Sequence, residues 1–428
     1  MAHIASIRSY LLRCLPIFTI SMLVFAICAC RSSSPAILQS PIVVASMGEK
    51  VFALDGQNGH ILWNQSGLYA EFIPLISDNM VYLATDKYTS LLAVDALTGA
   101  TRWTSEVSLV GIAPGKVYGT DHQYNILALS STDGQLLWKI PYTPQSQIKL
   151  FVAGDIPYLW QADASDVSGS LAALTPATGR VLWKTSLPAS VGMVAYPYDG
   201  LVFAFGGTPA GVRMYALDAV SGRLRWQVSS SPNTPNVIQV LDCGTNILCL
   251  AYSDGSITAV NSQDGTALWH FTYGAPIPSG EFFTPLTFAQ NGNSVLVTTP
   301  QHLAVVDIES GTLRWQRDFA TSAALSLSGT YPFQRGTLYV NAAEDQAQSQ
   351  WHIEALDAKT GKSQWEVSGA ESAAGYPLLL GDELINAPGN SVIAYDSANG
   401  SIAWQTTLPG SQQESIEFLS VALVSAGS

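Results

Sequence analysis

The chain contains 428 residues, of which 47% are hydrophobic and only 12% are charged, so it can form a large apolar core. Its 32 acidic residues outnumber its 19 basic ones, which gives a formal net charge of −13. A strongly acidic surface keeps a large protein soluble, and it disfavours binding to nucleic acids and to anionic lipid headgroups.

Residues 1–29 have the pattern of a bacterial export signal. Two arginines precede an apolar run that ends in small residues, and the sequence ICAC that ends at Cys30 resembles a lipobox. This predicts a lipoprotein-type signal peptide over residues 1–29, lipidation of Cys30, a tether over residues 30–40 and a folded part over residues 41–428. Secretion without a lipid and an uncleaved anchor helix are the alternatives. All three predict an extracytoplasmic protein of the cell envelope that contacts the membrane only through an anchor.

A short pattern recurs along the folded part: an apolar segment that ends in Asp, Asn, Ser or Thr, then three residues, Gly, three residues and Trp. The copy Ala216–Trp226 contains every element of it. The polar side chain can accept a backbone N–H and close a tight turn, and Gly supplies the positive φ that a hairpin loop requires. Each copy therefore predicts two antiparallel strands. Nine of the 11 tryptophans follow this rule: Trp63, Trp103, Trp138, Trp183, Trp226, Trp269, Trp315, Trp365 and Trp404.

Two further apolar runs precede most copies of the motif, as residues 237–242 and 247–252 do before Trp269. A full repeat is thus four short strands, of which the motif supplies the last two. The first run often contains Pro, which suits the innermost, edge strand of a blade. The motif tryptophans recur every 35 to 50 residues, a spacing typical of one propeller blade per repeat.

The two ends of the folded part predict how the ring closes. The first motif has only a weak candidate for its innermost strand, residues 35–39, and a spare apolar segment, residues 415–425, follows the last motif. Pairing between the N- and C-terminal strands would remove the exposed sheet edges. Nine copies predict nine blades, unless one repeat is degenerate and eight close, because propellers typically have about four to eight.

Cys243 and Cys249 are the only cysteines of the folded part, and they flank a predicted turn over residues 244–246. In a tight hairpin they would be out of register and too far apart to bridge. A wider loop would permit a disulfide, which an oxidising compartment favours. Two buried free thiols are the alternative, and they are the expectation here.

The repeat resembles the pyrroloquinoline-quinone (PQQ) type propeller repeat, A-[LV]-D-x-x-x-G-x-x-x-W, over roughly residues 40–425. The resemblance implies an all-β fold, a single propeller of four-stranded blades, with eight blades expected. It also implies that the nine motif tryptophans dock on the turn of a neighbouring blade and so join the blades. With the lipobox-like leader, the architecture is similar to that of the propeller lipoproteins of the outer-membrane β-barrel assembly machine.

Quinone-dependent dehydrogenases built from this repeat would hold PQQ and calcium over the central channel, beside a Trp platform, a disulfide between adjacent cysteines and an Asp as general base. The folded part has no adjacent cysteine pair, and its two tryptophans outside the motif, Trp160 and Trp351, are interpreted as core or groove-lining residues. The motif Asp recurs, which favours turn capping over catalysis. We therefore assign no catalytic, cofactor-binding or metal-binding residue.

The predicted function is a monomeric, non-catalytic scaffold that binds protein partners through its top loops or the channel mouth. The insertions 161–170 and 342–350 would form much of that surface. A PQQ-dependent dehydrogenase with calcium at the channel is the alternative. Two weaker hypotheses are a cation site and a glycan site, and their residues are Glu71, Glu281 and Glu371 for the first and Tyr196, Tyr198 and Tyr376 for the second.

Overall fold

The computed structural model describes residues 39–68, 74–85, 90–142, 148–162, 168–188, 190–208, 211–229, 237–252, 256–272, 286–288, 293–299, 302–318, 333–343, 351–369, 377–410 and 414–425. These residues belong to one compact unit, Leu38–Ser428. Their regular structure consists of β-strands. None of the described segments forms a helix that is long and apolar enough to cross a membrane.

The strands of the described residues form nine antiparallel sheets of four strands, which are the blades, numbered in chain order. Blade 1 contains β36 (Ile416–Ser425), β1 (Gln39–Met47), β2 (Lys50–Asp55) and β3 (Ile61–Ser66); blade 2 contains β4 (Leu75–Ser77), β5 (Met80–Thr85), β6 (Ser90–Asp95) and β7 (Thr101–Ser105); blade 3 contains β8 (Ser108–Ala113), β9 (Lys116–Thr120), β10 (Asn125–Ser130) and β11 (Leu136–Pro141). Blade 4 contains β12 (Ile148–Ala153), β13 (Ile156–Ala162), β14 (Gly169–Leu174) and β15 (Val181–Leu187); blade 5 contains β16 (Ser190–Tyr198), β17 (Leu201–Thr208), β18 (Gly211–Asp218) and β19 (Leu224–Ser229); blade 6 contains β20 (Val237–Asp242), β21 (Ile247–Tyr252), β22 (Ile257–Asn261) and β23 (Ala267–Phe271). Blade 7 contains β24 (Leu286–Phe288), β25 (Ser294–Thr299), β26 (His302–Asp307) and β27 (Leu313–Asp318); blade 8 contains β28 (Phe333–Gln334), β29 (Thr337–Ala343), β30 (Trp351–Asp357) and β31 (Ser363–Gly369); blade 9 contains β32 (Leu378–Leu380), β33 (Glu383–Asn386), β34 (Ser391–Asp396) and β35 (Ile402–Thr407).

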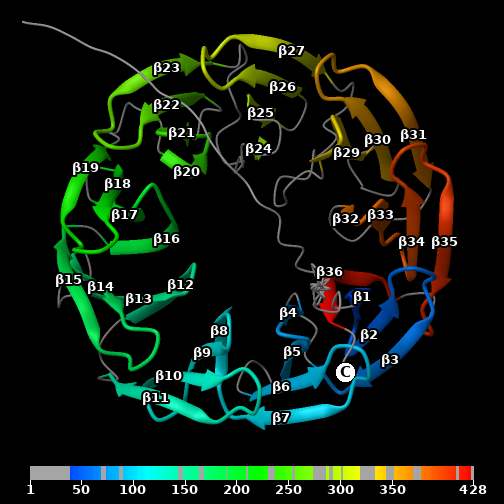
Figure 1. The fold of residues 1–428 in the computed structure, drawn as a ribbon, viewed down its shortest axis with the longest axis horizontal. Helices are drawn as coiled ribbons and strands as arrows, with labels where there is room; N and C mark the ends of the chain where they lie inside the picture. Colours follow the sequence, from blue (N-terminus) through cyan, green and yellow to red (C-terminus); the bar gives the residue numbers. More distant parts are fainter. Residues whose placement is uncertain are drawn as a thin grey trace, which may run out of the picture. The chain divides into compact units, whose positions relative to one another are not determined.

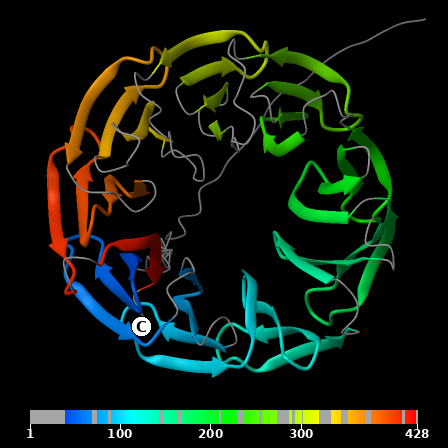
Figure 2. The same cartoon turned by 180° about the vertical axis from the view of Figure 1, so that it is seen from behind.

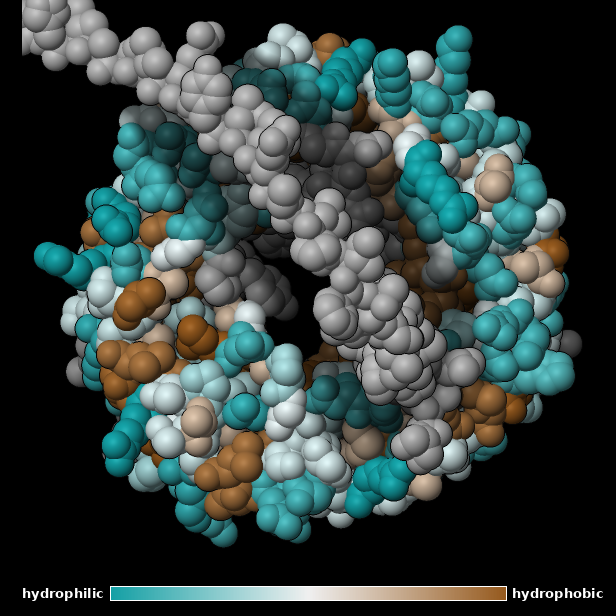
Figure 3. Space-filling model, in the orientation of Figure 1, coloured by the Kyte–Doolittle hydropathy of each residue, from teal (hydrophilic) through white to brown (hydrophobic). Residues whose placement is uncertain are grey.

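The blades are arranged in a ring, with the first strand of each blade towards the centre and the last strand on the outer rim (Figure 1, Figure 2). In the space-filling view an opening remains at the centre, and small apolar patches alternate with hydrophilic ones around the ring (Figure 3). We call the side on which the first two and the last two strands of a blade are joined the turn face, and the opposite side the loop face.

The propeller fold is confirmed, but the expectation of eight blades is wrong. All nine motif copies form separate blades in the described chain, because each copy has the strands needed to complete its own four-stranded sheet. No repeat is degenerate in the sense that the eight-blade alternative required. The ring accommodates the ninth blade because every pair of neighbours makes the same contact, described below.

The two ends of the propeller close the ring by pairing with each other, as predicted. Strand β36 lies antiparallel to β1, from the pair Gln39 and Ser425 to the pair Met47 and Ile416. The innermost strand of blade 1 is therefore β36, and not residues 35–39. Strand β1 begins at Gln39, inside the range assigned to the tether.

Each motif builds a capped turn on the turn face. In blade 5, Asp218 accepts hydrogen bonds from the amide (2.8 Å) and hydroxyl (2.7 Å) of Ser221, and Arg225 binds its other oxygen at 3.0 Å. The next residue, Gly222, has φ of 70°, a conformation that strains any residue with a Cβ. The bonds from Ser221, followed by that from Arg225, lower the pKa of Asp218 to about 2. The motif Asp is thus used to close its own turn.

Each motif tryptophan lies against the turn of the next blade. The indole N–H of Trp226 donates to the carbonyl of Ser262 at 2.8 Å, and its ring covers Gly265 so closely that a Cβ there would lie 2.9 Å from the ring. All nine indoles make this hydrogen bond, at 2.6 to 3.2 Å; the acceptors, from Trp63 onwards, are Ala96, Ser131, Pro176, Ala219, Ser262, Ile308, Ala358, Ser397 and, for Trp404, Gly56. The last of these bonds joins blade 9 to blade 1.

The two tryptophans outside the motif are core residues. Trp160 in β13 is 1% exposed and Trp351 in β30 is 6% exposed. Each packs on a glycine of a neighbouring strand of its own blade: Gly169 next to Trp160 and Gly369 next to Trp351 would both clash if they had a Cβ. The interpretation of these tryptophans as core is confirmed.

Cys243 and Cys249 form a disulfide, so the expectation of free thiols is wrong. Leu241 pairs with Cys249, which places Cys243 diagonally across from Cys249 on the same face of the two strands. The twist of paired strands brings one diagonal closer, and the two Cα atoms are 5.9 Å apart, within reach of a disulfide. The register argument failed because it considered only directly opposed residues.

Replacing Trp226 tests the contact between blades. Trp226→Ala removes a side chain that is 8% exposed and should reduce the free energy of unfolding by about 3–5 kcal/mol. Denaturant titration measures the change. Leu224→Ala is the matched control, because Leu224 lies on the same strand but is 48% exposed, and its effect should stay within about 0.5 kcal/mol. A loss below about 1 kcal/mol for Trp226→Ala would contradict the docking role.

The capped turns predict loss of stability in acid. The pKa of Asp218, and that of Asp307, which Arg314 and then Ser310 lower, are both about 2, below the ordinary value of 3.8. Both carboxylates therefore stabilise the folded state fully above about pH 4, and this contribution is lost as the pH falls through about 2. Urea unfolding across this range should have a steeper pH dependence for the wild type than for Asp218→Asn/Asp307→Asn. Equal slopes would sink the prediction.

Candidate functional site: a pocket between blades 7 and 8

The binding loops predicted from the sequence lie mostly outside the described residues. This holds for residues 163–167 and 344–350 of the two insertions, for Cys30, Glu71, Glu281, Glu371 and Tyr376, and for the side chain of Tyr196. The described ends of the first insertion, with Lys184 and Ser186 of β15, border a cavity of about 580 Å³. This cavity lies at the loop end of blade 4.

Two of the remaining hypotheses can be followed in the described residues. The hydroxyl of Tyr198 donates to the carbonyl of Gly244, and burial raises its pKa, so this side chain joins blade 5 to blade 6. Within the described ranges, no group of three or more His, Cys, Asp or Glu side chains could hold a metal ion.

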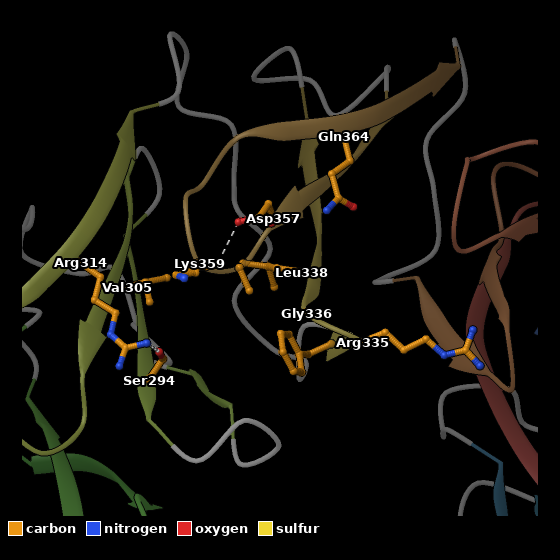
Figure 4. Close-up of a pocket in the computed structure, with 11 residues that line it drawn as sticks. Ser294, Val305, Arg314, Arg335, Gly336, Leu338, Asp357, Lys359 and Gln364 are labelled. Atoms are coloured by element: carbon orange, nitrogen blue, oxygen red, sulfur yellow. Dashed lines mark hydrogen bonds between the residues drawn. The ribbon is translucent and has the colours of Figure 1, made fainter.

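A pocket of about 450 Å³ lies between blades 7 and 8 on the turn face (Figure 4). We call it the 7/8 pocket. Its described lining residues are Ser294, Val305 and Arg314 of blade 7 and Phe333, Arg335, Gly336, Leu338, Asp357, Ala358, Lys359 and Gln364 of blade 8.

The blade 7 side of the pocket presents a held guanidinium. Arg314 binds Asp307 at 2.6 Å and donates to the hydroxyl of Ser294 at 2.9 Å. Figure 4 places Arg314 and Ser294 side by side. An arginine has five N–H donors in a fixed plane, so two bonds orient the group and leave donors for a ligand. Val305 of β26 adds a buried apolar contact at 2% exposure.

The blade 8 side combines a capped turn with an exposed amine. Asp357 accepts the amides of Lys359 (3.1 Å) and Thr360 (2.8 Å) and the Thr360 hydroxyl (2.7 Å), and the hydroxyl bond is the main cause of its lowered pKa. The Lys359 side chain is exposed, and among the described residues no ion pair is found for its amine. Gln364 accepts a hydrogen bond from Thr337 at 3.0 Å.

Arg335 belongs to the lining but its charged end points elsewhere. It sits in the turn between β28 and β29 with φ of 50°, and Figure 4 places its guanidinium away from the other side chains of the pocket. There it binds Asp382 of blade 9 at 2.9 Å, in a pair that is exposed and therefore weak. Phe333 and Leu338 complete an apolar floor, of which Leu338 is fully buried.

A buried ion pair joins the same two blades. Glu354 of β30 is 2% exposed, and Arg317 of β27 binds it at 2.8 Å. A buried carboxylate is costly unless a cation compensates it, so Arg317 is required at the position two residues after the motif tryptophan, where the other blades have neutral residues. Together these contacts make the interface between blades 7 and 8 rich in bases.

The pocket could not be predicted from the sequence, because its residues come from positions that the motif does not specify. Arg335 belongs to the turn between the first two strands, Lys359 to a variable place in the motif, and Arg314 to the residue before Trp315. The available signal was the gathering of bases around the seventh and eighth motifs of an acidic chain. Only the sheet register places these bases around one pocket.

Comparison with known proteins agrees with the fold. The sequence profile of the family described as outer membrane protein assembly factor BamB matches residues 31–148, 122–276 and 253–427. The outer membrane protein assembly factor BamB of Bordetella pertussis is 23% identical over 206 residues, which cover 47% of this chain and 48% of that protein. The tetrathionate hydrolase of Acidithiobacillus ferrooxidans is 22% identical over 334 residues, which cover 72% of this chain and 62% of that protein.

The match to these curated relatives thus spans about half to three fifths of their length. Among solved structures, apo AztD from Citrobacter koseri superposes with a TM-score of 0.52 at 10% identity, covering 77% of this chain and 95% of that one, which reflects the fold alone. The profile, in contrast, matches from residue 31 to residue 427 in three overlapping segments. The chain therefore belongs to the propeller family described as outer membrane protein assembly factor BamB.

Proposed function

We propose that the protein is a non-catalytic, extracytoplasmic propeller that acts as a rigid platform for protein partners in the cell envelope. The observation that carries the proposal is the use of the repeated polar residues. The described motif Asp side chains cap turns, and all nine indole N–H groups donate to the next blade. The repeated motif residues thus hold the ring together, and we assign partner binding to residues outside the motif.

The disulfide supports the proposed compartment. Disulfides persist in oxidising environments outside the cytoplasm, and Cys243–Cys249 closes a turn on the turn face. In this proposal residues 1–29 are removed, Cys30 carries a lipid, and the short stretch up to β1 tethers the ring to the membrane. The ring is then a monomer that presents its turn face, its loops and its channel mouth to proteins in the same compartment.

Partner binding can be tested by site-specific crosslinking in living cells. A photo-reactive residue at Gln364, which is exposed on the 7/8 pocket, or at Tyr124, which is 46% exposed in a turn of the loop face, should yield discrete crosslinks to envelope proteins. The same residue at Val220, which is 88% exposed at the tip of another blade, is the control for random collision.

The opposing result would be the same weak crosslinks at all three positions. Saturable binding of PQQ with calcium, together with oxidation of alcohols or sugars in a dye-linked assay, would contradict the scaffold proposal and show that the protein is a dehydrogenase. Both assays use the full-length protein.

The lipid anchor has its own test. Cys30→Ala should move the protein from the membrane fraction to the soluble fraction and abolish incorporation of labelled fatty acid, because no lipid can then be attached. Cys28→Ala is the matched control, since it changes a neighbouring leader cysteine and should leave the protein in the membrane fraction. Retention of Cys30→Ala in the membrane fraction would refute the anchor at this residue.

A further inference from the structure

At one position of the motif turn, six of the nine blades repeat with a period of three, whereas blades 1, 4 and 7 have Gly56, Pro176 and Ile308 there. In blades 2, 5 and 8 the motif Asp is followed by Ala, as in Asp95–Gly99, Asp218–Gly222 and Asp357–Gly361. In blades 3, 6 and 9 the corresponding residue is a buried serine: Ser131, Ser262 and Ser397, which are 1%, 0% and 5% exposed. Blades three apart are therefore more alike in this turn than neighbouring blades.

These serines make the same contact at three places around the ring. The Ser131 hydroxyl donates to Asp78 at 2.9 Å, and the Ser262 hydroxyl donates to Asp199 at 2.7 Å. The Ser397 hydroxyl lies 3.4 Å from the side-chain oxygen of Gln334. Asp78 and Asp199 lie in the turn between the first two strands of the preceding blade, and Gln334 is the strand residue directly before that turn. These contacts lie at the interfaces 2/3, 5/6 and 8/9. The interfaces one blade earlier, 1/2, 4/5 and 7/8, therefore occupy the same place in each group of three.

Equivalence allows the 7/8 pocket to be compared with two internal references. The residue before the motif tryptophan of the first blade is Leu62, Leu182 and then Arg314. The third residue of the second blade's motif turn is Leu97, Val220 and then Lys359, and the first residue of its inner turn is Asp78, Asp199 and then Arg335. Interface 7/8 therefore has a base at each of these three positions, where the two equivalent interfaces have apolar residues at two positions and an acid at the third.

The second blade of this interface also lacks a base that its two equivalents have, at the residue before the motif tryptophan. Arg102 and Arg225 bind the motif Asp of their own blades at 2.7 and 3.0 Å, whereas Gln364 is the equivalent residue in blade 8. The bases of the 7/8 interface are thus placed across the pocket mouth and not on the motif Asp of blade 8. Capping of that motif Asp is left to Thr360 and the backbone.

The pocket combines three features that one ligand can satisfy together. Lys359 supplies an exposed amine, Arg314 supplies a guanidinium oriented by Asp307 and Ser294, and Val305, Phe333 and Leu338 supply an apolar floor. Arg335 adds positive charge nearby without direct contact, since it binds Asp382. A carboxylate satisfies both bases, and an adjacent apolar side chain would cover the floor. A small inorganic anion would not cover Phe333, the partly exposed member of that floor.

We propose that the 7/8 pocket binds an acidic segment of a protein partner, in which a Glu or Asp side chain meets Lys359 and Arg314 and a neighbouring apolar side chain enters the pocket. The inference rests on the proposed scaffold function and names the chemistry of one of its partners. It assigns recognition to the turn face between blades 7 and 8, where the chain departs from its own internal references.

The probe is a fluorescein-labelled peptide that alternates Glu with Phe and Leu, titrated into the full-length protein and followed by anisotropy. Binding should weaken as NaCl rises from about 50 to 500 mM, because exposed charges are screened. Lys359→Val, which installs the residue found at position 220, should raise Kd by at least about fivefold. Lys362→Val is the matched control, since it removes an equal charge from the same blade outside the pocket and should leave Kd unchanged.

Three results would overturn the proposal. The first is equal affinity of the peptide for wild type and Lys359→Val, and the second is equal binding of a peptide with Gln in place of Glu. The third is full competition by acetate when it replaces chloride at constant ionic strength. A melting temperature equal to that of the wild type checks that Lys359→Val is folded. If Lys359→Val retains its envelope crosslinks from Tyr124 but the peptide does not bind the wild type, the scaffold proposal stands and this inference fails.

Discussion

The contact between each motif tryptophan and the turn of the next blade is the interaction on which the ring depends. A four-stranded sheet has two faces to bury, and the apolar clusters of the protein each combine residues of two neighbouring blades, as Phe52 and Leu54 do with Ile385 and Trp404. The indole covers a glycine because only a residue without a Cβ allows this approach. Since Trp404 lies on Gly59, the contact runs around the whole ring and leaves no free blade.

This constraint also separates the parts of the repeat that build the ring from the parts that can change. The Gly and Trp of the motif are used in every interface, so their replacement costs stability. The residue before the tryptophan and the turn between the first two strands are not needed for docking. Arg314 and Arg335 occupy these positions in blades 7 and 8. The type of side chain can therefore vary at the blade interfaces on the turn face.

The motif predicted much of the fold and little of the site. The motif and the apolar runs before it predicted the strands and the turns, since a hairpin turn is a local property. The spare apolar segment at the C-terminal end predicted the closure of the ring. The number of blades was predicted wrongly, because the eight blades expected from the family were preferred to the nine motif copies in the chain. The disulfide was missed because Cys243 and Cys249 meet on a diagonal, which depends on strand twist. The pocket joins residues more than 60 positions apart, such as Ser294 and Lys359, and only the assembled blades bring them together.

Blade 1 is built from both ends of the propeller, so its sheet cannot be completed before the C-terminal strand β36 has been made. A chain that emerges from its N-terminus presents β1, β2 and β3 first, yet the inner edge of their sheet stays unpaired until β36 has emerged. An unpaired sheet edge is a template for pairing with another chain. A polypeptide that stalls before Ile416 therefore leaves an open arc with an unpaired inner edge in blade 1, and this edge must be shielded until β36 has paired with β1.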